Sequence, residues 1–170
     1  RGKVKREDYC SQLVRLIVSG SIRQGHLLVL ISAESLRSVG FKAEDLLCTG
    51  FLLPDLRKGG YTGAEMKAAK LKASQLMAGG YTAGELRKGG FSAAQLKLAG
   101  YTAADLRLGG FPARQLKAVG FTAEELKANG FSVTELREGT FTAKELHPLK
   151  YTPLEMRLAG FMAAELKELF

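Results

Sequence analysis

The sequence has few of the residues from which catalytic, metal and disulfide sites are built. Its 170 residues include two histidines, His26 and His147, and two cysteines, Cys10 and Cys48. Their spacing fits neither a disulfide framework nor a set of metal ligands. The Gly-x-x-x-x-Gly-Lys-[Ser/Thr] loop that cradles phosphates is also missing. These absences argue against an enzyme, a cofactor or a bound metal, and we expect both cysteines to be buried, reduced thiols.

Long apolar runs are lacking as well. The longest, from Leu27 to Ile31, is far shorter than the roughly 20 residues that span a bilayer, so we expect no membrane span. The sequence has neither a signal-peptide pattern nor an initiator Met. The missing Met suggests a processed chain or a segment of a longer one. Reduced cysteines without a signal peptide favour an intracellular location.

What the sequence does contain is a ten-residue pattern that fills residues 31–170 in fourteen blocks without insertion or deletion. Position one of every block is aromatic or large aliphatic, and position six is always Leu or Met. The clearest block is Phe121-Thr-Ala-Glu-Glu-Leu-Lys-Ala-Asn-Gly130. A fixed period of this kind is typical of a repeat architecture.

Each block carries the signals for the start and end of a helix. Ser or Thr at position two, followed three residues later by Glu, Asp or Gln, predicts an N-cap and a capping box, as in Thr122 and Glu125. The residues at positions one and six then form a hydrophobic staple. Gly at position ten, as in Gly130, suits the left-handed turn after a helix. We therefore predict one helix of roughly two turns per block, stabilised by its neighbours, because isolated helices this short are marginal in water.

The fold class expected is all-α: an α-solenoid, of either hand, with a helical N-terminal cap. Residues 1–30 would form a basic lead followed by the cap, with an amphipathic helix at 7–19 and a second segment at 22–30, and residues 31–170 would form one continuous array. A square β-helix of pentapeptide type is the alternative, because large apolar residues recur every five residues. Its tight interior would not fit Arg114, Glu124 or Lys144, and the capping boxes would have no purpose there.

Departures from the pattern carry further predictions. At Lys70-Leu71-Lys72 both the glycine and the N-cap are missing, which favours one helix of about seventeen residues from Thr62 to Ala78. Pro148-Leu149-Lys150 should alter a turn without breaking the count. Tyr and Glu or Asp in blocks 61, 81 and 101 alternate with Gln in blocks 71, 91 and 111. This twenty-residue period indicates two blocks per structural unit, with odd and even helices in different layers.

With these motifs the chain resembles tandem decapeptide proteins, whose repeat is similar to Gly-Phe-Thr-Ala-x-Glu-Leu-Lys and which we associate with short-helix solenoids in large microbial proteins. The likeness covers residues 31–170, and blocks 51–60, 71–80 and 141–150 depart from it. The resemblance implies an architectural or binding role and identifies no individual protein.

The net charge of +8 comes partly from the N-terminal tract, where residues 1–30 hold six basic and two acidic residues, and it favours acidic partners. Within the array, position seven is repeatedly Lys or Arg. We take the row Arg87, Lys97, Arg107, Lys117 and Lys127 as the candidate surface for a partner or for phosphates. The recurrent carboxylates fit capping boxes better than an active site, which occurs once.

The leading hypothesis is a non-enzymatic scaffold for extended protein partners, a structural subunit of a larger assembly among its forms. The alternative is a solenoid that binds nucleic-acid phosphates through position seven, while the position-one tyrosines remain in the core. The favoured explanation of position seven is a row of solvated cations that complement helix C-termini. An enzyme would need a pocket, most simply between the N-terminal cap and the first blocks.

Overall fold

The computed structural model describes residues 32–169, which form one short helix per ten-residue block. The helices are α3 (Ala33–Ser38), α4 (Ala43–Cys48), α5 (Leu53–Lys58), α6 (Gly63–Ala68), α7 (Ala73–Ala78), α8 (Ala83–Lys88), α9 (Ala93–Leu98), α10 (Ala103–Leu108), α11 (Ala113–Ala118), α12 (Ala123–Ala128), α13 (Val133–Glu138), α14 (Ala143–Leu146), the 3-10 helix η1 (His147–Leu149), α15 (Pro153–Leu158) and α16 (Ala163–Leu166). No strand occurs between residues 32 and 169, so the β-helix alternative is wrong there. The predicted all-helical repeat arrangement is confirmed.

Most of the described helices begin as the sequence predicts, although the N-caps of α4, α5, α7, α11 and α16 make no side-chain cap bond. In α12, the backbone N–H of Glu125 donates to Thr122 Oγ1 at 3.1 Å. The backbone N–H of Thr122 donates back to Glu125 Oε2 at 2.8 Å. This reciprocal capping box satisfies two N–H groups that have no partner inside the helix. The box recurs in α6, α9, α10, α13, α14 and α15.

Each helix ends in a turn that also starts the next helix. After α12, the N–H of Phe131 donates to the carbonyl of Leu126, and the N–H of Gly130 donates to the carbonyl of Lys127, both at 3.0 Å. This is the Schellman pattern, which needs a left-handed residue, and Gly130 has φ 86°. Phe131 therefore closes α12 against Leu126 and precedes the N-cap of α13. The two motifs together explain why large apolar residues recur every five residues.

The predicted seventeen-residue helix from Thr62 to Ala78 is wrong. The chain turns between α6 and α7, with Lys70 in the left-handed conformation at φ 60°. The N–H of Leu71 donates to the carbonyl of Met66 at 3.2 Å, so the same turn forms without glycine. The predicted effect of Pro148 is confirmed, because α14 is shortened and continues as η1 without disturbing the ten-residue count.

The described residues fall into two compact units, which we treat separately: residues 32–81 with 88–90, and residues 82–87 with 91–169. In the first unit α3 packs on α5. A ladder of buried tyrosines joins positions twenty residues apart. Tyr61 Oη donates to the carbonyl of Phe41 at 2.9 Å, and Tyr81 Oη donates to that of Tyr61 at 3.0 Å. Alternate blocks therefore lie side by side.

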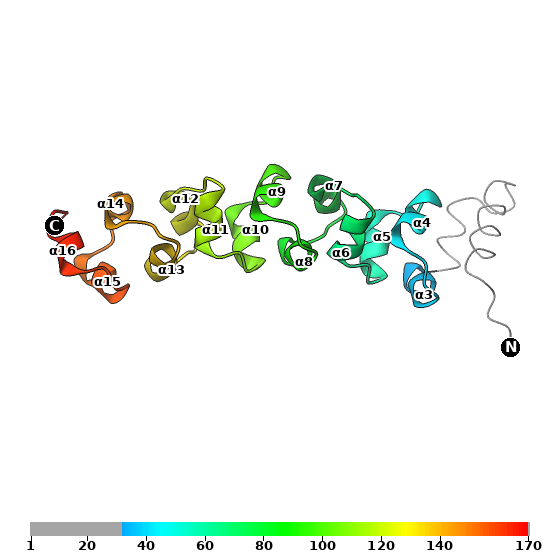
Figure 1. Cartoon of the computed structure of the whole chain (residues 1–170), viewed down its shortest axis with the longest axis horizontal. Helices are drawn as coiled ribbons and strands as arrows, with labels where there is room; N and C mark the ends of the chain where they lie inside the picture. Colours follow the sequence, from blue (N-terminus) through cyan, green and yellow to red (C-terminus); the bar gives the residue numbers. More distant parts are fainter. Residues whose placement is uncertain (1–31, 170) are drawn as a thin grey trace, which may run out of the picture. The chain divides into compact units, whose positions relative to one another are not determined.

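The second unit has the same alternation. Helix α10 packs on α12, α11 on α13, and α13 on α15. Helices α12 and α14 lie on one side of this unit and α13 and α15 on the other (Figure 1). The approach is close, since a Cβ added at Gly109 would lie 2.9 Å from the backbone nitrogen of Gly84. The layers predicted from the twenty-residue period are thus confirmed.

The core runs along the helices as a line of single leucines and methionines. Position six is fully buried from Leu46 to Met156, and the position-one rings and position-three alanines pack around it. Apart from the tyrosines, no polar or charged residue is buried in the described part of the chain. The predicted N-terminal cap and basic lead lie outside the described residues, and the single continuous domain stays a prediction.

Candidate functional site: position seven and a recurring cleft

The five cations predicted as a partner surface all lie in the second unit, where they contact the protein itself. Four of the side chains donate to backbone carbonyls 22 or 23 residues later in the chain. Arg87 reaches Gly109 at 3.3 Å, and Lys97 reaches both Val119 and Gly120 at 2.9 Å. The other two donations run from Lys117 to Thr140 at 2.9 Å and from Lys127 to Leu149. Since these carbonyls end helices, the cations satisfy groups that lack helical partners.

Each of the five cations also lies over the aromatic ring 24 residues later. The distances to the ring centroid run from 4.1 Å, for Lys97 over Phe121, to 5.7 Å, for Arg87 over Phe111. The other pairs are Arg107 with Phe131, Lys117 with Phe141, and Lys127 with Tyr151. Cations over rings at such distances are attracted by the ring quadrupole. Position seven is therefore part of the packing between blocks, and the role of these cations toward a partner stays a prediction.

A carboxylate completes the arrangement in several blocks. Arg107 pairs with Glu135 at 3.7 Å and Lys117 with Glu145 at 2.9 Å in the second unit. In the first unit, Arg37 pairs with Glu65 at 3.4 Å. Each acid lies 28 residues after its cation and belongs to a capping box. One carboxylate thus binds its own helix N-terminus and a cation from another block.

These contacts change the acidity of the carboxyl groups. Donation from the backbone N–H of Ser132 lowers the pKa of Glu135, and the Ser132 hydroxyl and Arg107 lower it further. Burial by itself would raise the pKa of Glu65, but Thr62 and Arg37 outweigh it and lower the pKa below its usual value. Both acids are held in the charged form that the pairs require.

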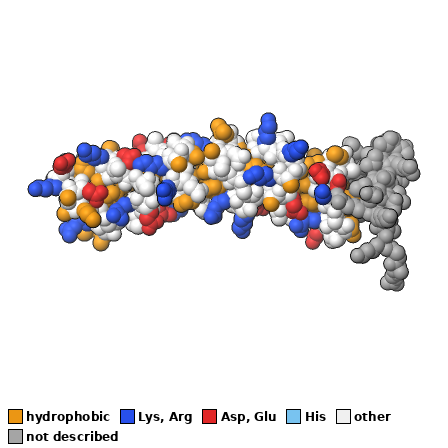
Figure 2. Space-filling model, viewed as in Figure 1, with side chains coloured by type: hydrophobic (Ala, Val, Ile, Leu, Met, Phe, Trp, Pro, Cys, Tyr) orange, Lys and Arg blue, Asp and Glu red, His pale blue; other side chains and the backbone are white. Residues whose placement is uncertain are grey.

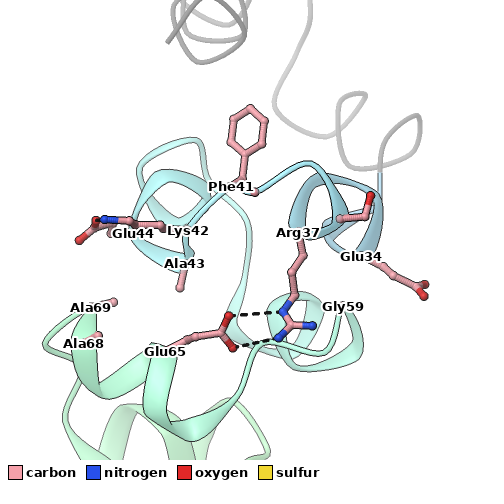
Figure 3. Close-up of a pocket in the computed structure, with 12 residues that line it drawn as sticks. Glu34, Arg37, Phe41, Lys42, Ala43, Glu44, Gly59, Glu65, Ala68 and Ala69 are labelled. Atoms are coloured by element: carbon pink, nitrogen blue, oxygen red, sulfur yellow. Dashed lines mark hydrogen bonds and ion pairs between the residues drawn. The ribbon is translucent and has the colours of Figure 1, made fainter. Parts of the chain in front are cut away.

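Two clefts form beside these Arg–Glu pairs, one in each unit. The first cleft, of about 780 Å³, is lined by Arg37, Phe41, Lys42, Glu44, Glu65 and Ala68, among others. In Figure 3, Arg37 and Glu65 point toward each other across it, from α3 and α6, and the ring of Phe41 points away from the pair. The second cleft, of about 260 Å³, is lined by Arg107, Phe111, Pro112, Arg114, Glu135 and Glu138, among others. Every one of these six residues stands 70 positions after its counterpart in the first cleft.

The two clefts share their framework and differ in their walls. Position seven, position one and position five supply Arg, Phe and Glu in both. Positions two, four and eight supply Lys42, Glu44 and Ala68 in the first cleft. They supply Pro112, Arg114 and Glu138 in the second. The repeat therefore builds one type of cleft whose chemistry is set by exposed residues that the core does not constrain.

The cysteine, the possible metal ligands, the helix hydropathy and the surface charge indicate no further site in the described residues. Cys48 is exposed, so the prediction of a buried thiol is wrong for it, and Cys10 lies outside the described residues. Between residues 32 and 169, no group of three His, Cys, Asp or Glu side chains could hold a metal ion. No described helix has the length and hydropathy to cross a membrane. Lys and Arg side chains are spread singly over the face drawn in Figure 2 and do not join in one stripe.

Comparison with known proteins gives a match at the level of the repeat. Residues 31–103, 80–153 and 110–169 each match the family described as "Decapeptide repeat region". No curated protein and no solved structure matches the chain significantly.

Proposed function

Because the chain belongs to the decapeptide repeat family, we propose that it is a non-catalytic scaffold whose outer surface binds extended protein partners. The observation that carries the proposal is the recurrence of one cleft with a constant framework and variable walls. A surface on which exposed residues vary while the core repeats suits the recognition of long partners.

The large apolar side chains outside the core also support a binding surface. Leu98, Leu108 and Leu158 all occupy position eight and are strongly exposed, at 89%, 86% and 78%. They add nothing to the core. Exposed large aliphatic side chains are available for apolar contacts with a partner.

Photo-crosslinking from the second cleft tests the proposal. Arg114, on its wall, is replaced by benzoylphenylalanine, and the matched control carries it at Thr134, also an exposed position four but outside this cleft. In cells that naturally express the protein, we expect protein adducts at residue 114 and few at 134. A partner identified from the adduct must then bind the purified chain and lose affinity on Arg114→Ala. Equal labelling at both positions, or binding unchanged by Arg114→Ala, would refute the proposal.

The nucleic-acid alternative receives less support, because the five position-seven cations already contact carbonyls and rings within the chain. A salt titration separates the two functions. Oligonucleotide binding that weakens steeply with salt would favour the alternative, because phosphate binding releases counterions. We expect no binding even in low-salt buffer.

A further inference from the structure

One turn in the first unit departs from the repeat at three successive positions. This basic turn, residues 67–72, has the sequence Lys-Ala-Ala-Lys-Leu-Lys and joins α6 to α7. Lys70 stands where ten other blocks have a glycine with positive φ, and its own φ is 60°. Lys72 stands at an N-cap where most blocks have Ser or Thr, and it makes no side-chain cap bond. Both substitutions disfavour the turn, since a left-handed lysine is strained and an N-cap bond is missing.

The side chains of Lys70 and Lys72 form no bond that stabilises the turn. The turn closes through backbone groups: Lys70 N–H donates to the carbonyl of Lys67 at 3.0 Å, and Leu71 N–H donates to that of Met66 at 3.2 Å. Lys70 and Lys72 are exposed. Neither amino group pairs with any residue that the structure describes. Residues that contradict the local conformational preference, and form no stabilising contact in return, are candidates for functional positions.

The basic turn itself concentrates positive charge, because three of its six residues are lysines. Lys67 Nζ donates to the carbonyl of Gly90, whereas Lys70 and Lys72 point no amino group at a described partner. No acidic residue occurs from 66 to 84. Glu65, just before this stretch, is held by Thr62 and Arg37 at the other end of α6. Glu44 lines the first cleft with Ala68 of the turn, and it already pairs with Lys42 at 3.7 Å.

We infer that Lys70 and Lys72, supported by Lys67, bind an acidic segment of a protein partner. The inference rests on the proposed scaffold function and names the partner's chemistry. An acidic peptide fits better than nucleic acid, because the rings near this turn lie in the core and leave none to stack on bases: Tyr61 and Tyr81 are each 2% exposed. The unpaired cations are also lysines, which bind carboxylates as point charges and lack the bidentate phosphate geometry of arginine.

The test uses the whole 170-residue chain and a fluorescein-labelled oligoglutamate peptide, followed by fluorescence anisotropy at low and high salt. The variant Lys70→Gly with Lys72→Thr restores the common residues of the repeat. We expect it to melt at a higher temperature and to bind the peptide about tenfold more weakly, since charge pairs contribute to both affinity and encounter rate. The matched control is Lys150→Gly, which relieves a left-handed lysine with φ 57° in the other unit. It should raise the melting temperature and leave binding unchanged.

Three results would overturn the inference. These are no binding of oligoglutamate to the wild-type chain, equal affinities for wild type and double variant, or tighter binding of a length-matched oligothymidylate that the same variant abolishes. The last would assign the turn to phosphates. Each of these results is independent of the crosslinking from residue 114, so failure here and failure of the scaffold proposal can be told apart.

Discussion

Truncating one core leucine tests whether the helices hold each other in place. Leu106 is fully buried, whereas Leu108, two residues later on the same helix, is 86% exposed. Replacing a buried Leu by Ala costs about 2–5 kcal/mol, from lost burial and from the cavity. We therefore expect Leu106→Ala to lower the free energy of unfolding by that amount. Leu108→Ala removes the same atoms from an exposed site and should change it by less than about 0.5 kcal/mol.

Arg107 provides the second comparison. Its side chain is 39% exposed and loses one ion pair and one ring contact on truncation. Exposed pairs contribute about 0–1 kcal/mol and exposed cation–ring contacts about 0.5–1 kcal/mol. Arg107→Ala should therefore cost about 1 kcal/mol. Leu106→Ala should exceed it at least twofold.

Far-ultraviolet circular dichroism during thermal and urea unfolding measures these differences. At about 2–4 °C per kcal/mol for a chain of this size, Leu106→Ala should melt about 4–20 °C below the wild type, and Arg107→Ala no more than about 4 °C below it. Because stability in repeat arrays is a sum over neighbours, the unfolding curve of Leu106→Ala should also broaden. Equal melting shifts for Leu106→Ala and Leu108→Ala would refute the packing described here.

Two further predictions concern packing and pH. Gly109→Ala should destabilise by about 1–3 kcal/mol, because its Cβ would lie 2.9 Å from the backbone of Gly84. Gly84→Ala, whose Cβ meets nothing closer than 3.5 Å, should instead stabilise by up to about 1 kcal/mol in urea unfolding. A stabilising Gly109→Ala would contradict the close approach. The lowered pKa of Glu135 contributes stability that is present above the ordinary value of 4.5 and is lost as pH falls through the folded value. The melting temperature of the wild type should thus be constant near neutral pH and decrease below about pH 4.5. The decrease should be smaller in Glu135→Gln. An equal decrease in the two proteins would show that Glu135 does not contribute to the acid sensitivity.

The local structure was readable from the sequence because its signals act within ten residues. Thr122, Glu125 and Gly130 define the ends of α12 through bonds to their own neighbours. The same local signals gave the wrong prediction at Lys70, where the missing glycine favours a continuous helix if only local preferences are counted. The packing of alternate blocks overrides that preference, as the Tyr81–Tyr61 hydrogen bond illustrates.

The site was harder to predict, because its contacts link residues far apart in sequence. Nothing local indicates that Arg107 meets Phe131 and Glu135, 24 and 28 residues away. The alternation of Tyr and Gln blocks was the only signal that alternate helices pack together. The clefts beside the Arg–Glu pairs could have been found by placing position seven against position five three blocks later.

Each position-one aromatic residue belongs both to the end of one helix and to the start of the next, so no linker residues separate the repeats. Because Phe131 finishes one helix and introduces the next, inserting a single amino acid would put every later leucine out of phase with its neighbours. Such a protein can grow or shrink only in whole decamers, and with least disturbance in pairs of them, since the strongest packing between blocks joins alternate helices such as α11 and α13. Duplication and deletion of twenty-residue segments are therefore the changes of length that this architecture tolerates, and they would alter the number of repeats while preserving the packing of alternate helices.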